Sequence, residues 1–157
     1  LSAEWKDVEL VAREWRILAE RMKMRRPHIV TLSDQAVVIL KELEPITGQG
    51  RYLFPASSDP DKHLRDNRIL FALKKLGYAN GEMSFHGFRA MASTLLNELG
   101  YNRDWIERQL AHCPRDAVRA SYNYAEYLPE RRRMMQEWAD YLTALKIQKG
   151  KLHERND

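Results

Sequence analysis

Apolar residues recur at helical spacing between Ser84 and Gly100, in the stretch SFHGFRAMASTLLNELG. Three or four residues separate neighbouring members of the series, so they would share one face of a helix. The series is Phe88, Met91, Ala92, Leu95, Leu96 and Leu99. Gly100 follows the last of them, and glycine readily adopts the left-handed conformation that ends helices. The pattern therefore predicts a core helix that begins near His86.

A second pattern, rich in β-branched and aromatic residues, predicts a small sheet near the N-terminus. The segments WRIL at residues 15–18 and HIVTL at residues 28–32 have the composition of short strands. The basic connection between them, residues 19–27, predicts an antiparallel hairpin with a positively charged tip. Residues 52–54 are expected to add a third strand, before a polar loop at residues 56–61.

Capping residues and further apolar stripes predict more helices. Ser33 is suited to cap the first of them, and Gly77 to end the second. The expected helices run from Ser33 to before Pro45, over residues 62–76, over 103–110 and over 130–146, with one or two helical turns at 115–122. The last long helix carries an apolar stripe made of Met134, Trp138, Tyr141, Leu142 and Leu145.

These elements together predict an α+β domain that is mostly α-helical, with a small three-stranded antiparallel sheet near the N-terminus. The domain is expected to span residues 1–147. The charged tail at residues 148–157 is expected to fray, as terminal segments without apolar anchors do.

Composition narrows the class of protein. The 157 residues suffice for one domain with a substantial core, and no apolar run approaches the roughly 20 residues of a membrane-spanning helix. The single cysteine, Cys113, excludes an internal disulfide and fits a reducing, cytoplasmic setting. One Cys and five scattered His have no zinc-binding spacing. The net charge of +4 is too small to establish a nucleic-acid partner by itself.

The positive charge is clustered, however, and clusters of this kind are typical of phosphate-binding surfaces. Three consecutive arginines occupy residues 131–133. A second cluster lies on the predicted hairpin and is expected to contact DNA: Arg21, Lys23, Arg25 and Arg26, followed by His28.

Several residues along the chain are candidates for chemistry. His86 and Arg89 lie three residues apart, on the side of their helix away from the apolar stripe and near its N-terminus, where an anion would be attracted. His112 directly follows the helix predicted at residues 103–110, and Tyr122 comes ten residues later. Taken singly, each has a simpler interpretation as a cap, a surface salt bridge, a helix-end histidine or a packed tyrosine.

Taken together and in this order, these residue types are those that cleavage of a phosphodiester without a metal would require. The phenol of Tyr122 can attack phosphorus and form a covalent intermediate. Arg89 can bind two non-bridging oxygens at once, and Lys23 can protonate the leaving 5′-oxygen. His86 and His112 can orient the phosphate or exchange protons with the tyrosine.

Three segments resemble the catalytic domain of tyrosine recombinases, the phage integrase family, and in particular the integrases of prophages and genomic islands. The segments are AERMKMRRPHIVTLS (19–33), SFHGFRAMAST (84–94) and LAHCPRDAVRASYNYAEYLPERRRMM (110–135). The resemblance implies site-specific DNA recombination, in prophage integration or excision, by strand cleavage and rejoining through a 3′-phosphotyrosyl intermediate. It also implies residue roles: Lys23 as the general acid, His86 and Arg89 as the second catalytic box, His112 as a phosphate contact, and Tyr122 as the nucleophile ahead of Tyr124 and Tyr127.

The resemblance implies partners as well. They are double-stranded DNA attachment sites, further copies of the chain in a homotetramer on DNA, and DNA-bending and directionality factors. The setting would be the bacterial cytoplasm at the nucleoid, with no membrane, no metal and no cofactor. The family has another catalytic Arg upstream of the pair that is Glu4-Trp5 here, so an N-terminal truncation is expected and residues 1–157 alone should be inactive.

Two alternatives to a recombinase stay open. One is a helical module that uses its basic hairpin to bind DNA without chemistry. The other is a type IB topoisomerase, against which the prophage-like hairpin sequence argues.

Overall fold

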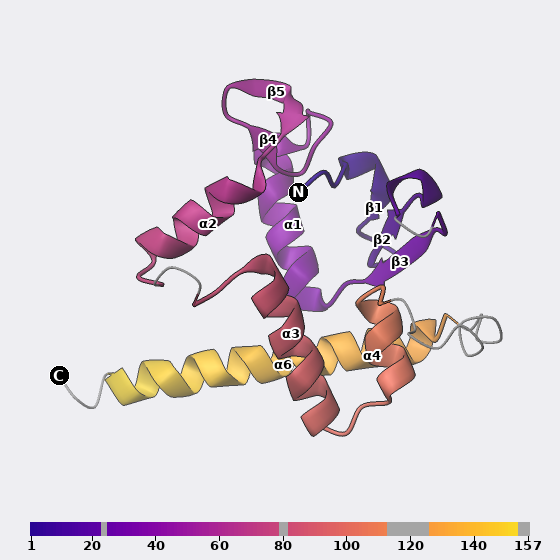
Figure 1. The fold of residues 1–157 in the computed structure, drawn as a ribbon, viewed down its shortest axis with the longest axis vertical. Helices are drawn as coiled ribbons and strands as arrows, with labels where there is room; N and C mark the ends of the chain where they lie inside the picture. Colours follow the sequence, from indigo (N-terminus) through magenta and orange to yellow (C-terminus); the bar gives the residue numbers. More distant parts are fainter. Residues whose placement is uncertain (23–24, 79–81, 113–125, 154–157) are drawn as a thin grey trace.

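The computed structural model describes residues 1–22, 25–78, 82–112 and 126–153, with side chains through residue 148. The fold is α+β and mostly helical, as predicted (Figure 1). Its elements in chain order are η1 (Trp5–Asp7), β1 (Val8–Glu9), β2 (Glu14–Ile17), η2 (Ala19–Arg21), β3 (His28–Thr31), α1 (Asp34–Thr47), β4 (Pro55–Ala56), β5 (Asp59–His63), α2 (Asp66–Lys75), α3 (Phe85–Glu98), α4 (Arg103–Gln109) and α6 (Leu128–His153).

The N-terminal sheet has three antiparallel strands in the order β1-β2-β3. The two predicted strands are confirmed as β2 and β3, and Trp15 in the middle strand pairs with Val8 on one side and Val30 on the other. The prediction of residues 52–54 as the third strand is wrong. A tight reversal brings β1 back onto β2 instead, through Arg13, which has a φ of 56°. Residue Tyr52 forms only an isolated bridge with Glu4.

The hydrophobic core lies between α3, α4 and α6, which cross one another in the lower half of Figure 1. Its buried members are Leu96, Ile106, Met134 and Trp138. The prediction that the whole apolar stripe of α3 is core is wrong. Only Leu96 in that stripe is buried, whereas Phe88, Met91 and Leu99 are 37% to 49% exposed. The core therefore supports the C-terminal half of α3, and the N-terminal half extends away from it.

Helix α1 begins where it was predicted but ends later. The Ser33 hydroxyl accepts a hydrogen bond from the Ala36 amide at 3.3 Å, which confirms Ser33 as the N-cap. The helix then continues through Pro45 to Thr47, and the prediction that it ends before the proline is wrong. A proline in the last turn removes one helical hydrogen bond, while the Gly48 amide still donates to the Glu44 carbonyl.

Three other predicted boundaries also change. The polar loop predicted at residues 56–61 and the start of the helix predicted at 62–76 belong to the β4–β5 hairpin instead. Helix α2 therefore begins only at Asp66. The last helix, α6, runs from Leu128 to His153 and so includes the start of the tail that was expected to fray. The final residues, 154–157, lie outside the described residues, as do the helical turns predicted at 115–122.

In the described parts of the chain, no helix is both long enough and apolar enough to cross a membrane.

Candidate functional site

The first part of the site is the N-terminal end of α3, which carries His86 and Arg89. The hydroxyl of Ser84 accepts a hydrogen bond from the Gly87 amide at 3.0 Å and so caps the helix. This cap fixes the first turn of the helix. It thereby orients His86, which lies in that turn, and Arg89, which lies in the next. Both side chains are exposed. They are therefore available to a ligand that approaches this end of the helix.

The second part is the chain that follows α4. The Arg89 guanidinium donates a hydrogen bond to the Leu110 carbonyl, which joins α3 to the end of α4. Next, Ala111 turns the chain with a φ of 51°, and the His112 amide donates to the Glu107 carbonyl at 2.9 Å. This sharp turn brings His112 back toward α3.

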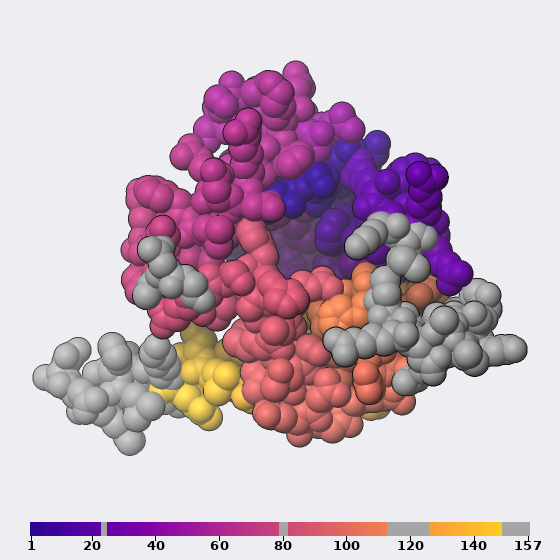
Figure 2. All heavy atoms as spheres, viewed as in Figure 1, coloured from indigo at the N-terminus to yellow at the C-terminus, as the bar shows by residue number. Residues whose placement is uncertain are grey.

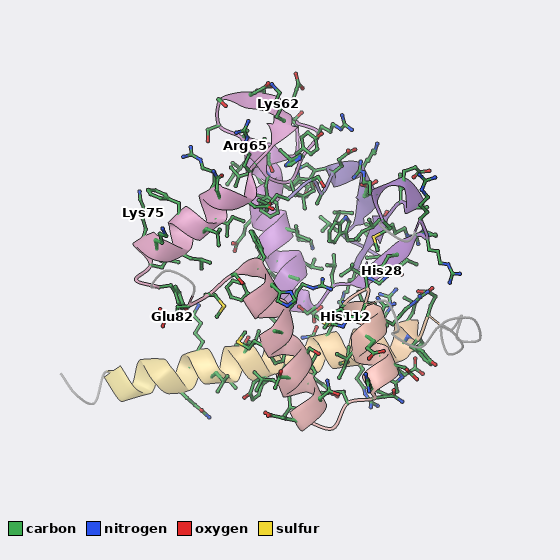
Figure 3. All side chains as sticks on the ribbon, in the orientation of Figure 1. His28, Lys62, Arg65, Lys75, Glu82 and His112 are labelled. Atoms are coloured by element: carbon green, nitrogen blue, oxygen red, sulfur yellow. The ribbon has the colours of Figure 1, made fainter. Side chains whose placement is uncertain are left out.

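The surroundings of His112 affect its ionisation. Partial desolvation lowers the pKa of His112, and the positive charge of Arg89 and the proximity of His86 lower it further. A lowered pKa favours the neutral imidazole at pH 7, which can accept a proton. The structure thus brings together three of the five predicted catalytic residues, from α3 and from the end of α4. Figure 3 shows His112 at the centre of the molecule.

The predicted DNA-binding residues of the hairpin divide into two groups. Arg21 binds Glu4 and Asp7, with 2.7 Å between its Nη1 and the Asp7 Oδ2. His28 is only 5% exposed, and its Nε2 lies 3.4 Å from the Gln109 carbonyl oxygen. Both side chains are therefore engaged inside the domain. The remaining predicted contacts, Arg25 and Arg26, are exposed.

Both acidic partners of Arg21 are buried, and Glu4 is 2% exposed. Hydrogen bonds from Arg51 and Lys6, together with the charge of Arg21, lower the pKa of Glu4 to about 2. This carboxylate is therefore ionised at neutral pH, and it holds three cations around the start of the chain. Sequence reasoning assigned Arg21 to DNA because nothing in the basic cluster itself reveals these acidic partners.

Two predicted catalytic residues, Lys23 and Tyr122, lie outside the described residues. In the sequence, the described residues nearest to Lys23 are Met22 and Arg25, and those nearest to Tyr122 on its two sides are His112 and Glu126.

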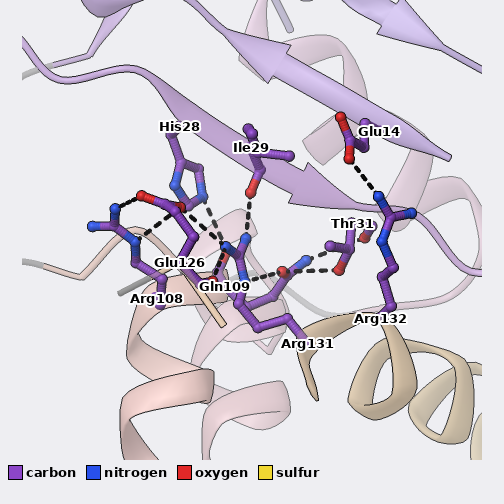
Figure 4. Close-up of polar contacts among 9 residues, drawn as sticks. All are labelled: Glu14, His28, Ile29, Thr31, Arg108, Gln109, Glu126, Arg131 and Arg132. Atoms are coloured by element: carbon purple, nitrogen blue, oxygen red, sulfur yellow. Dashed lines mark hydrogen bonds and ion pairs between the residues drawn. The ribbon is translucent and has the colours of Figure 1, made fainter. Parts of the chain in front are cut away.

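Sequence reasoning missed a polar junction beneath the site, which Figure 4 shows. Gln109, at the end of α4, exchanges two hydrogen bonds with Thr31 of β3: its Oε1 accepts from the Thr31 hydroxyl at 3.1 Å, and its Nε2 donates to the Thr31 carbonyl at 3.3 Å. Arg131 of α6 donates its Nε–H to the same Oε1 at 2.9 Å. The junction therefore joins β3, α4 and α6, at a residue that lies three before His112 in the sequence.

The arginines at residues 131–133 do not form a basic patch. Arg131 is fully buried, Arg132 binds Glu14 and the Ala12 carbonyl, and Arg133 lies 3.6 Å from the Glu137 carboxylate. One signal could have revealed the burial of Arg131. It precedes Met134 by three residues and Trp138 by seven, so it falls on the apolar stripe of its helix.

The surface on this side of the molecule is hollowed at its centre, between the N-terminal sheet, the start of α3 and α4 (Figure 2). A separate hollow of about 790 Å³ lies between the β4–β5 hairpin and the start of α2. Its lining includes Lys62, Arg65 and Arg68 but none of the candidate catalytic residues. Figure 3 shows Lys62 and Arg65 far from His112, so this second hollow is not part of the candidate site.

The α+β fold, mostly helical with a small three-stranded antiparallel sheet, is the class of domain that the sequence predicted. The chain belongs to the phage integrase family, whose model matches residues 1–128.

Its curated relatives are integrases. The chain is 43% identical to the prophage integrase IntA of Escherichia coli K12 over 142 residues, which is 90% of this chain and 34% of the relative. It is 43% identical to the integrase of Enterobacteria phage P4, over 89% of this chain and 35% of the relative. It is 42% identical to the integrase of Shigella phage Sf6, over 90% of this chain and 37% of the relative. The chain thus spans about a third of the length of these relatives. No solved structure matches it significantly.

Proposed function

We propose that this chain is the catalytic region of a site-specific tyrosine recombinase, which integrates or excises a prophage by cutting and rejoining DNA through a 3′-phosphotyrosyl intermediate. The observation that carries the proposal is the convergence of Arg89, from α3, and His112, from the chain after α4, in a member of the phage integrase family. An isolated His-x-x-Arg pair on one helix would not require a second histidine beside it.

Arg89 is suited to bind the scissile phosphate. Its hydrogen bond to the Leu110 carbonyl uses one of the five N–H groups of the guanidinium. The other N–H groups can bind two non-bridging oxygens of a phosphate and stabilise the negative charge that develops on them in the transition state. Because guanidinium groups can provide this stabilisation, the proposed step requires no metal.

Two protons move in the proposed reaction: one leaves the attacking phenol, and one is added to the departing 5′-oxygen. The phenol oxygen of Tyr122 attacks phosphorus and forms the P–O bond of the phosphotyrosine, while the bond to the 5′-oxygen breaks. The phenol proton passes to His86 or His112, and the lowered pKa of His112 suits it to accept that proton. Lys23 donates a proton to the departing 5′-oxygen. The roles of Tyr122 and Lys23 rest on the resemblance to the family.

The DNA contacts that we propose on the hairpin are Arg25 and Arg26, because both are exposed. Arg21 and His28 were also predicted to contact DNA. Both of these side chains bind partners within the domain. The partners proposed for the whole protein are double-stranded attachment sites, a homotetramer on DNA, and DNA-bending and directionality factors, in the bacterial cytoplasm at the nucleoid. Since the chain spans about a third of its relatives, we expect residues 1–157 alone not to recombine DNA.

The test is formation of a covalent protein–DNA adduct by the full-length protein, resolved on a denaturing gel in the presence of EDTA. The wild type should form the adduct, and Arg89→Lys should form it about 10²-fold more slowly or worse because a lysine cannot bind two phosphate oxygens in the same way. Salt-dependent DNA binding should persist in the variant. Binding without any adduct in the wild type would contradict the proposal and favour a non-catalytic DNA-binding module.

A further inference from the structure

The guanidinium of Arg131 is the centre of the buried junction behind the candidate site. Arg131 lies in the first turns of α6 and is 0% exposed. It donates to the Gln109 side-chain oxygen at 2.9 Å, to the Glu126 carbonyl at 3.0 Å, and to the Ile29 carbonyl. One side chain thus connects the end of α4, strand β3 and the chain that enters α6 (Figure 4).

The two described residues that flank the Tyr122 region are both held at the last turns of α4. On one side, His112 donates its amide to the Glu107 carbonyl, and the preceding Leu110 carbonyl accepts from Arg89. On the other side, the Glu126 carboxylate forms an ion pair with Arg108 of α4. In the sequence, Tyr122 lies ten residues after His112 and four before Glu126.

Glu126 is held twice, because Arg131 binds its main chain and Arg108 binds its side chain. The Glu126 carboxylate also lies 3.6 Å from Arg131 Nη1, so its negative charge faces both guanidinium groups. Burial, with the positive charge of Arg108, lowers the pKa of Arg131 to about 10, which leaves the group charged at neutral pH. The acidic side chain thereby balances two neighbouring cations at the point where α6 begins.

We propose that Arg131 is a positioning residue for DNA cleavage: through Gln109 and through the carbonyl and carboxylate of Glu126, it holds Glu126, four residues after Tyr122 in the sequence, at the same turn of α4 that presents His112. This inference rests on the proposed function. Arginine is required because its planar guanidinium donates in three directions at once, to a side-chain amide and to two carbonyls. Lysine has a single ammonium nitrogen and cannot reach all three acceptors.

The experiment compares Arg131→Lys with Arg133→Lys in the full-length protein. Arg133 is two residues away on the same helix, its side chain is 70% exposed, and it pairs with Glu137 at the surface, so it controls for loss of an arginine from α6. The measurement is the single-turnover rate of covalent adduct formation at saturating DNA, with DNA affinity and melting temperature determined in parallel.

Arg131→Lys should slow adduct formation about tenfold or more at saturating DNA, because a displacement of the reacting group of about 1 Å is enough for such a loss. Its DNA affinity should match that of the wild type, and Arg133→Lys should match the wild type in all three measurements. A purely structural role would lower the melting temperature of Arg131→Lys but leave the rate of the folded protein unchanged, and that result would overturn the inference.

A second variant, Glu126→Ala, tests the inference about Arg131 if Arg131→Lys does not fold. Glu126→Ala removes the carboxylate that pairs with both Arg131 and Arg108, at a partly exposed site, so the fold should survive, and adduct formation should again slow while DNA affinity holds. Cleavage at the wild-type rate by folded Glu126→Ala would overturn the inference on its own. Failure of the wild type to form an adduct would instead contradict the proposed function, and the inference with it.

Discussion

Arg89 donates a hydrogen bond from its guanidinium to the main-chain carbonyl of Leu110, two residues before His112. This bond joins the helix that carries the His-x-x-Arg pair to the turn that carries the second histidine. Any movement of the turn is therefore transmitted to Arg89, and the geometry of the two histidines depends on how the chain turns at Ala111.

Replacing Ala111 with glycine should relieve backbone strain. Ala111 has a φ of 51°, in the left-handed region that glycine adopts without a steric penalty. We expect Ala111→Gly to be neutral or to raise the free energy of unfolding by up to about 1 kcal/mol, and Ala111→Val to lower it by about 1–2 kcal/mol. Urea unfolding of the 157-residue chain measures both changes.

The matched control for that substitution is Ala72→Gly, in the middle of α2 and exposed. Ala72 has ordinary helical geometry, so glycine there should lower the free energy of unfolding by about 1 kcal/mol. Equal losses from Ala72→Gly and Ala111→Gly would show that the turn at Ala111 is not strained.

The stability of the chain should fall as the pH drops from about 6.5 to about 4 because of His28. Burial, and then the charge of Arg131, lower the pKa of His28 from 6.5 to about 4. In this range the unfolded chain binds a proton that the folded chain excludes, so acid favours unfolding. The loss amounts to at most about 3 kcal/mol. It is complete only below the folded pKa, and it is absent above pH 6.5.

Denaturant unfolding at several pH values measures this loss in the wild type and in His28→Gln. The variant has no imidazole at this position, so its free energy of unfolding should change less between pH 6.5 and pH 4. His63→Gln, at an exposed site in β5, is the matched control and should keep the wild-type pH dependence. The same pH dependence in His28→Gln as in the wild type would refute this account of His28.

Lys23→Ala should slow cleavage of ordinary DNA by the full-length protein, because the leaving 5′-oxygen then lacks its proton donor. A substrate with sulfur in place of that oxygen has a leaving group that needs no proton. The variant should therefore cut the sulfur-containing substrate nearly as fast as the wild type does. Equal losses on both substrates would remove Lys23 from the general-acid role.

The pattern of residues within single segments was sufficient to predict part of this fold. Strand β3 was predictable from its consecutive β-branched residues, and β2 from its tryptophan and isoleucine. His86 and Arg89 share a side of α3 because of their spacing alone. The third strand was not predictable in this way. Val8 pairs with Trp15 through a tight reversal at Arg13, which adopts a positive φ although it is neither glycine nor asparagine.

The contacts in the site between segments that lie far apart in the sequence could not be predicted from local pattern. The contact between Arg89 and the Leu110 carbonyl depends on how α3 packs against α4, which no sequence spacing specifies. The basic clusters were misleading because charge alone does not distinguish a solvated arginine from a buried one. Arg131 is buried with its hydrogen bonds satisfied by Gln109 and main-chain carbonyls, and only its place on an apolar stripe distinguishes it from Arg133.

The proposed attack of Tyr122 on the DNA phosphate can be tested by finding which tyrosine carries the phosphate in the covalent adduct. The full-length protein would be trapped as its DNA adduct, digested with protease and nuclease, and analysed by mass spectrometry for the phosphotyrosine peptide. We predict that the modification lies on Tyr122, that Tyr122→Phe forms no adduct while it still binds DNA, and that Tyr124→Phe and Tyr127→Phe still form it. A phosphotyrosine on Tyr124 or Tyr127, or an adduct formed by Tyr122→Phe, would contradict the account.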